Sequence, residues 1–201
     1  MSEQYFEKRP ESAHRPAEIR VVIRDHRFTF RTDAGVFSRG ELDRGTELLL
    51  EALVIGPGER ILDLGCGYGA IGIVAARLSP TSEVVLTDVN ERAVALARTN
   101  LAANGIGNAE VRLGPLYEPV EDMTFDHIVS NPPIRAGRRI VDRIVAEATA
   151  HLLPGGKLWL VARTRQGADA LRSRMAQAFG SAEIAKRGSG FKVFRSVKSE
   201  A

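Results

Sequence analysis

The sequence has a single cysteine, few histidines and no long apolar run. Cys66 stands alone, which excludes an internal disulfide, and the four histidines are too scattered to predict a metal site. No stretch approaches the roughly eighteen consecutive apolar residues that a membrane-spanning helix needs. The polar N-terminal segment lacks the apolar core of a secretory signal. We therefore expect a cytoplasmic protein without metal or membrane contact.

The charge is distributed unevenly along the chain. With 201 residues, 44% of them hydrophobic, the chain is long enough for one domain of ordinary size. Residues 1–134 carry 14 Lys and Arg against 20 Asp and Glu, whereas residues 135–201 carry 14 against 5. A basic C-terminal third is typical of a surface for a polyanion such as RNA, although a merely solvated face is the alternative interpretation.

The apolar pattern changes its period several times. Two alternating runs at 19–24 and 28–32 predict a β-hairpin, which a glycine-rich loop at 33–45 follows. Strands are then expected at 60–65, 83–88, 108–114, 125–131 and 157–162, with a final antiparallel pair at 181–187 and 190–198. Helices are expected at 47–53, 71–78, 90–105, 138–153 and 166–179. Alternation of this kind predicts an α/β fold with a doubly wound, mostly parallel sheet.

This pattern also suggests a division of the chain. Residues 1–45 are expected to form an N-terminal extension, with the hairpin and the loop, and residues 46–201 a single α/β domain. Because ligands of such sheets bind at the carboxyl ends of the strands, the loops after the core strands are the candidate site.

One of these loops, DLGCGYGAIG at 63–72, is rich in glycine. Gly65, Gly67 and Gly69 permit a tight turn and the close approach of a ligand, although a purely structural turn would need them as well. Asp63 lies within the apolar strand before the loop, and Asp88 ends the next strand, where an acid can bind ribose hydroxyls. The carboxylate of Asp63 beside this loop would repel a pyrophosphate. It suits S-adenosylmethionine, whose amino-acid end Asp63 would orient while Asp88 holds the ribose.

With these features, the chain resembles the class I S-adenosylmethionine-dependent methyltransferases. LDLGCGYG is similar to their first motif, and the stretches DAGVFSRGELDRGT, DVNERAVALARTN and SNPPIRAG narrow the resemblance to RsmC-like ribosomal RNA guanine-N2 methyltransferases, in a single-domain form. The resemblance implies a Rossmann-like fold, S-adenosylmethionine as cofactor, and ribosomal RNA or the small ribosomal subunit as partner. It implies cofactor contacts from Asp63, Gly65, Cys66, Gly67, Asp88, Val89 and Asn131.

The stretch SNPPIRAG follows the fourth core strand and is the candidate catalytic loop. Transfer of a methyl group to an exocyclic amine requires the nitrogen lone pair to be aimed at the methyl carbon. The side-chain oxygen of Asn131 and the carbonyl of Pro132 would accept hydrogen bonds from the amine, and the resemblance implies the same role. Pro133 stiffens the loop, and Ile134 offers an apolar face. A Pro-Pro turn capped by Asn131 is the structural alternative.

Five further residues are candidates for substrate binding. Phe37 and Ser38, in GVFS, match a motif of the family near the cofactor or target pocket. Arg135, Arg138 and Arg139 follow the catalytic loop and are expected to meet phosphates beside the target base. A solvated helix start is the alternative for the three arginines.

The sequence departs from the family at one place and leaves two other functions open. Gly114 and Pro115 replace the usual acidic residue near the adenine, so backbone groups and apolar contacts around Leu116 are expected instead. A protein glutamine N5-methyltransferase is one alternative, because the lone pair of an amide nitrogen is delocalised in the same way. Enzymes of that kind carry an aromatic residue where this chain has Ile134. A non-catalytic binding module would require a disrupted cofactor loop.

Overall fold

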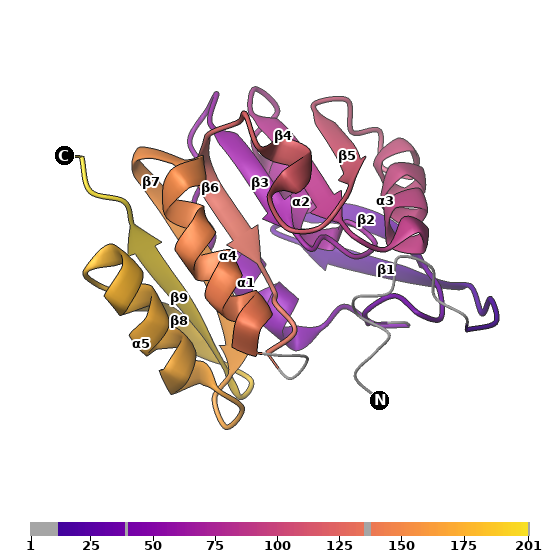
Figure 1. Cartoon of the computed structure of the whole chain (residues 1–201). Helices are drawn as coiled ribbons and strands as arrows, with labels where there is room; N and C mark the ends of the chain where they lie inside the picture. The colour runs from indigo at the N-terminus through magenta and orange to yellow at the C-terminus, as the bar shows by residue number, and fades with distance from the viewer. Residues whose placement is uncertain (1–11, 39, 135–137, 201) are drawn as a thin grey trace.

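The computed structural model describes residues 12–38, 40–134 and 138–200. A seven-stranded sheet in the order β5-β4-β3-β6-β7-β9-β8 carries helices on both faces, and the hairpin β1-β2 forms a separate sheet (Figure 1). The strands are β1 (Ala17–Ile23), β2 (His26–Thr32), β3 (Arg60–Leu64), β4 (Glu83–Asp88), β5 (Ala109–Leu113), β6 (Phe125–Ser130), β7 (Leu152–Arg163), β8 (Glu183–Gly188) and β9 (Phe191–Val197). The helices are α1 (Arg44–Ala52), α2 (Ala70–Leu78), α3 (Glu91–Ala103), α4 (Arg138–His151) and α5 (Ala168–Phe179), with a short 3-10 turn at Glu118–Val120.

The predicted fold class is confirmed. Strands β3, β4, β5, β6 and β7 pair in parallel, and β9 runs antiparallel to both β7 and β8. The chain leaves β5 at one edge of the sheet and returns at β6 beside β3, so the strand order reverses at the β3–β6 pair. The carboxyl ends of these strands therefore meet at the position where such sheets bind ligands.

Two apolar cores lie on opposite faces of the sheet. Helices α1, α2 and α3 and the hairpin share one core with residues such as Ile61 and Trp159. Helices α4 and α5 share the other core with residues such as Leu62 and Leu160, and Figure 1 shows them crossing that face of the sheet. Neighbouring strand residues thus point into different cores, as expected for strands buried on both faces. Within the described ranges, no helix is long and apolar enough to cross a membrane.

The hairpin is attached to α3 by two buried asparagines. The side chain of Asn100 accepts from the N–H of Arg31 and donates to its carbonyl, and Asn104 does the same with Thr29. The two amides, one helical turn apart, thus pair with the backbone of β2 as a neighbouring strand would. This satisfies polar groups that would be costly to bury unpaired.

Most predicted helix ends are close, and one prediction is wrong. Asn90 caps α3 as expected, since its side chain accepts from the N–H groups of the next turn. The helix expected at 138–153 and the strand expected at 157–162 leave a break at Pro154, Gly155 and Gly156, but the chain has no break there. Helix α4 ends at His151, and these three residues lie within β7, where the register to β6 shifts and Gly155 and Gly156 bond to the backbone of residue 198.

A polar network lies in the middle of the sheet. His127 is fully buried, its Nδ1 accepts from the indole N–H of Trp159 at 3.0 Å, and its Nε2 lies 2.8 Å from a carboxylate oxygen of Glu59. Burial lowers the pKa of His127 against the opposing effect of Glu59. The imidazole is therefore neutral, with its proton on Nε2 and donated to Glu59. This accounts for His127 as a core residue.

Candidate active site

A pocket of about 200 Å³ opens at the carboxyl ends of the central strands. It is lined by residues that follow β3, β4, β5 and β6, and by Ile140, Arg143 and Ile144 of α4. A smaller pocket adjoins it and is lined by the glycine loop together with Phe37 and Thr46. Asn131 lines both pockets. The strand-end loops that the sequence indicated thus meet in one place.

The glycine loop turns sharply under the pocket. Gly65, Gly67 and Gly69 have φ values of 72°, 57° and 93°, a region that favours glycine. A Cβ on Gly65 would meet nothing within 4 Å, so its conformation requires glycine while the space beside it stays open to a ligand. Cys66 is buried, and burial raises the pKa of its thiol, which does not suit a nucleophile.

Asp88 is held at the pocket wall by the backbone. One carboxylate oxygen accepts from the N–H of Gly67 and the other from the N–H of Asn90, each at 2.8 Å. Burial raises the pKa of Asp88 despite these hydrogen bonds. Because each carboxylate oxygen can accept more than one hydrogen bond, both retain capacity for hydroxyl groups in the pocket, where Val89 is a neighbouring wall residue.

Asp63 lies beneath the loop and is fully buried. Its Oδ2 accepts from the N–H of Gly72 at 2.8 Å, which ties β3 to the first turn of α2. Its Oδ1 has no hydrogen-bond partner among the described residues. Burial raises the pKa of Asp63 to about 7, and the nearby charge of Asp88 adds to the effect. A buried, unsatisfied carboxylate oxygen is what a cofactor ammonium group would stabilise, directly or through water.

The amide of Asn131 is fixed by residues from a distant part of the chain. Its Nδ2 donates to Oδ2 of Asp43 and to Oγ1 of Thr46, each at 3.0 Å. Asp43 also caps α1, because the same carboxylate oxygen accepts from the N–H groups of Gly45 and Thr46. With both amide hydrogens committed, the side-chain oxygen of Asn131 is left as an acceptor, and Asn131 lines both pockets. The sequence reasoning missed Asp43 and Thr46, although an aspartate before an apolar helix is a recognisable cap.

The rest of the catalytic loop is packed into the protein. The carbonyl of Pro132 accepts from the N–H of Ile134 at 2.8 Å, which leaves it one further lone pair. Pro133 lines the main pocket. Ile134 is half-buried, and a Cβ on Gly167 would lie 2.9 Å from it, so the loop after β7 packs closely against it.

The predicted substrate residues are dispersed around the pockets. Phe37 is 38% exposed and lines the smaller pocket, whereas the hydroxyl of Ser38 donates to the carbonyl of Glu41 in its own loop. Arg138 and Arg139 are exposed in the first turn of α4. Arg135 lies outside the described residues.

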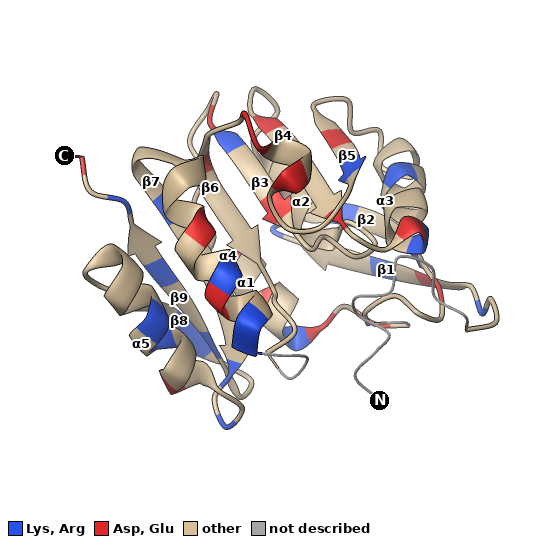
Figure 2. Cartoon of the chain, viewed as in Figure 1, with Lys and Arg blue, Asp and Glu red and all other residues tan. Residues whose placement is uncertain are grey.

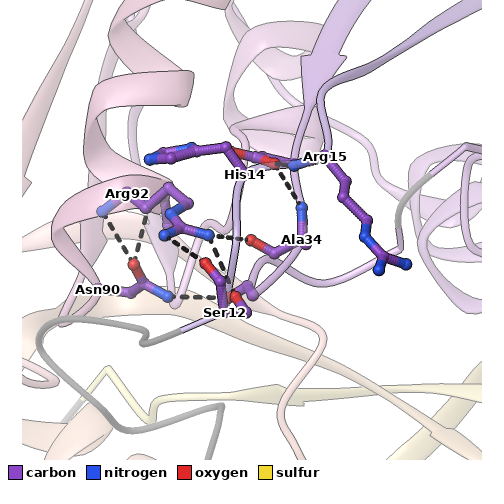
Figure 3. Close-up of polar contacts among 9 residues, drawn as sticks. Ser12, His14, Arg15, Ala34, Asn90 and Arg92 are labelled. Atoms are coloured by element: carbon purple, nitrogen blue, oxygen red, sulfur yellow. Dashed lines mark hydrogen bonds and ion pairs between the residues drawn. The ribbon is translucent and has the colours of Figure 1, made fainter.

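The loop that carries Phe37 is anchored to the start of α3. Asn90 donates to the carbonyl of Gly35, and the Arg92 guanidinium donates to the carbonyl of Ala34 and to Ser12 (Figure 3). These contacts hold the N-terminal segment beside Asp88. The sequence analysis did not indicate them, because they join residues that are more than fifty positions apart.

Gly114 and Pro115, which the sequence analysis placed near the adenine, form one wall of the main pocket. Both residues line it together with Leu116, whose φ of 48° is unusual for a leucine. Ile140 and Ile144 complete this wall, and the sequence analysis did not assign them.

Comparison with known proteins gives a consistent result. The model of the family described as "Methyltransferase small domain" matches residues 27–195. The uncharacterized protein YbxB of Bacillus subtilis is 35% identical, over 98% of this chain and 100% of its own length. Ribosomal RNA small subunit methyltransferase C of Hamiltonella defensa is 38% identical, over 83% of this chain and 49% of its own length.

A solved structure agrees with these relatives. The T. thermophilus 16S rRNA N2 methyltransferase RsmC, in complex with AdoMet and guanosine, superimposes with a TM-score of 0.82 and 30% identity. The match covers 94% of this chain and 52% of that one. This chain thus spans about half the length of the RsmC proteins it matches.

Proposed function

Because the chain belongs to the methyltransferase small domain family and is an S-adenosylmethionine-dependent methyltransferase, we propose that it methylates the exocyclic N2 amine of a guanine in small-subunit ribosomal RNA. The observation that carries this proposal is the amide of Asn131. Its two hydrogens are bound by Asp43 and Thr46, which leaves its oxygen as an acceptor on a residue that lines both pockets.

The cofactor would be held at the β3 and β4 ends. Asp88 would accept from the ribose hydroxyls, and the unpartnered oxygen of the buried Asp63 would stabilise the ammonium group through water. Gly65 and Gly67 leave room for close approach, and Leu116 and Val89 offer apolar walls. Bound there, S-adenosylmethionine supplies an electrophilic methyl group. The acidic side chains of Asp63 and Asp88 suit this cofactor, because it is positively charged and contains no phosphate group.

The chain's own contribution to the reaction is to aim the amine. The single lone pair of the amine nitrogen is delocalised into the guanine ring, and holding both N–H groups would direct this lone pair toward the methyl carbon. Asn131 Oδ1 would accept one hydrogen and the remaining lone pair of the Pro132 carbonyl the other. Both acceptors carry a partial negative charge beside a nitrogen that becomes positive, and neither needs to reorganise. The surplus proton then leaves to solvent, so no strong base is required.

The choice of ribosomal RNA as substrate depends on two observations. The RsmC relatives are named for ribosomal RNA, and one was solved with guanosine. Phe37 is an exposed aromatic at the smaller pocket, where an unstacked base could lie against its ring. A base in an RNA duplex would have to leave its stack to reach Asn131.

The proposal can be tested with purified ribosomal fractions. The protein is incubated with methyl-labelled S-adenosylmethionine and separate small-subunit RNA, large-subunit RNA and ribosomal protein, and the RNA is then digested to nucleosides. We expect label in N2-methylguanosine from small-subunit RNA, and labelling that is slower by about 10²–10³ with Asn131→Ala. Label in protein glutamine would instead favour the N5-methyltransferase, and label in another nucleoside would refute the guanine assignment.

A further inference from the structure

Six exposed arginines lie along one half of the edge that carries Asn131. We define this arginine rim as Arg44, Arg138, Arg139, Arg163, Arg165 and Arg187. They come from the starts of α1 and α4, the end of β7 with the loop after it, and the end of β8. Figure 2 shows Lys and Arg gathered around these ends of α4, β7, β8 and β9.

The rim is not explained by ion pairing within the protein. In the described part of the chain, none of the ion pairs involves a rim arginine. The pKa of Asp169 is lowered mainly by its hydrogen bond to Lys192, and Arg187 adds only a minor contribution. Some basic residues elsewhere are paired, as Arg174 is with Asp142 and Lys186 with Glu51, and others, such as Arg27, are in none of the ion pairs of the described residues. Six unpaired positive charges on one edge repel one another, so their clustering does not serve stability.

Three rim arginines also occupy unfavourable positions in their helices. Arg44 begins α1, and Arg138 and Arg139 begin α4, whose first turn contains no acidic residue. The N-terminal end of a helix carries a partial positive charge, so a cation there lowers helix stability. Helix stability therefore does not explain the placement of Arg138 and Arg139.

The rim is physically continuous with the catalytic loop. Gly167, two residues after Arg165, packs closely against Ile134. Farther out, the guanidinium of Arg163 lies 4.8 Å from the ring centroid of Phe191. Stacked on this ring, Arg163 is held in a fixed place at the end of β7, with its side chain still exposed to solvent.

The other half of the same edge has the opposite character. Asp88 lies at the end of β4, and the exposed Glu118 follows β5. Arg92 is basic, but its guanidinium is occupied by the carbonyl of Ala34 and by Ser12 (Figure 3). One edge therefore offers an acidic half, which suits a cationic cofactor, and a basic half, which suits a polyanion.

We propose that the arginine rim binds the phosphates of the RNA strand next to the target guanine, so that this strand runs from Asn131 across the ends of β7, β9 and β8. This inference rests on the proposed function, since it assumes an RNA substrate. It adds the direction in which the RNA lies and the residues that hold it, four of which are outside the catalytic loop and its helix: Arg44, Arg163, Arg165 and Arg187.

The test compares two doubly substituted proteins that lose the same charge. Arg165→Gln with Arg187→Gln removes two rim arginines, and Arg20→Gln with Arg27→Gln removes two exposed arginines of the hairpin. Binding to small-subunit RNA is measured over a range of salt concentrations. Each phosphate contact contributes about 0.7 to the slope of log affinity against log salt for a single strand, so we expect the rim variant to lose about 1.4. RNA affinity and kcat/KM should fall about tenfold or more, whereas the hairpin variant should match the parent.

Two additional measurements separate the possible outcomes. Cofactor affinity, measured by calorimetry, should be unchanged in the rim variant, and Arg165→Lys with Arg187→Lys should retain the salt slope because lysine keeps the charge. Equal salt slopes in the rim variant and the hairpin variant would refute the proposal that the arginine rim binds RNA phosphates. If the parent protein methylates no RNA guanine at all, it is the proposed function that fails.

Discussion

Thr46→Val should slow methyl transfer by loosening the amide of Asn131 at the smaller pocket, which Thr46 also lines. The substitution preserves the shape of the side chain but removes the oxygen that accepts from Nδ2 of Asn131 at 3.0 Å. Asp43 still accepts from the same nitrogen. The amide of Asn131 can then rotate more easily into an orientation that presents N–H groups, not oxygen, to the amine.

The size of the effect follows from the hydrogen bonds at this amide. A typical hydrogen bond contributes about 1 kcal/mol net, and one to a charged group about 1.5–3 kcal/mol. Loss of the Thr46 bond should therefore reduce the rate about fivefold, because 1.4 kcal/mol corresponds to about a factor of ten. Asn131→Ala removes the oxygen itself and should cost about 10²–10³, by analogy with removing one oxyanion-hole group. Thr46→Ser keeps the acceptor and should stay close to the parental rate.

The assay is single-turnover methylation of small-subunit ribosomal RNA with saturating cofactor, in a double-mutant cycle. If Thr46 acts through Asn131, Thr46→Val should have little further effect in the Asn131→Ala background. An equal fivefold loss in both backgrounds would mean that Thr46 acts elsewhere, for example through the stability of α1. No loss in either background would refute the reasoning that the amide needs to be held.

Three other substitutions test the cofactor site and its packing. Asp88→Ala should weaken S-adenosylmethionine binding by about 1–3 kcal/mol in calorimetry, and parental affinity would exclude a ribose contact. Asp63 has a folded pKa of about 7, above its unfolded value of about 3.9, so its contribution to stability is lost as the pH rises through this interval. Without cofactor, Asp63→Asn should therefore gain stability relative to the parent as the pH rises from about 4 to about 7 in denaturant titrations, and a constant difference would contradict this. Gly72→Ala should lower the melting temperature, since its Cβ would lie 2.5 Å from Leu86, whereas Gly107→Ala faces open space and should not.

Periodicity predicted the sheet because its signals are local. The core strands are short apolar runs bounded by glycine or asparagine, and each helix repeats its apolar residues at helical spacing. Pro154, Gly155 and Gly156 misled this reasoning because the backbone of residue 198, more than forty positions away, bonds to two of them and keeps them in β7. Contacts of this range leave no mark on a local pattern.

The sequence predicted the site residues at the strand ends, but not the residues that hold them from distant parts of the chain. Asp63, Asp88 and Asn131 lie at strand ends, and parallel topology alone brings such ends together. Asp43 and Thr46 contact Asn131 across 88 and 85 positions, and only the packing of α1 on the sheet places them there. The division of the chain into residues 1–45 and 46–201 stays a prediction. Its boundary falls between Asp43 and Thr46, which both accept from the amide of Asn131.

The network of His127 and Trp159 provides an optical reporter. Trp159 is the chain's single tryptophan, it is fully buried, and its indole N–H is bound to His127. Intrinsic tryptophan emission from the native protein therefore arises from one environment at the centre of the sheet. Acid titration should shift this emission only below the ordinary histidine pKa of about 6.5, because protonation of His127 removes the acceptor of the indole and burial delays it. The protein thus carries a built-in spectroscopic label for the integrity of its core.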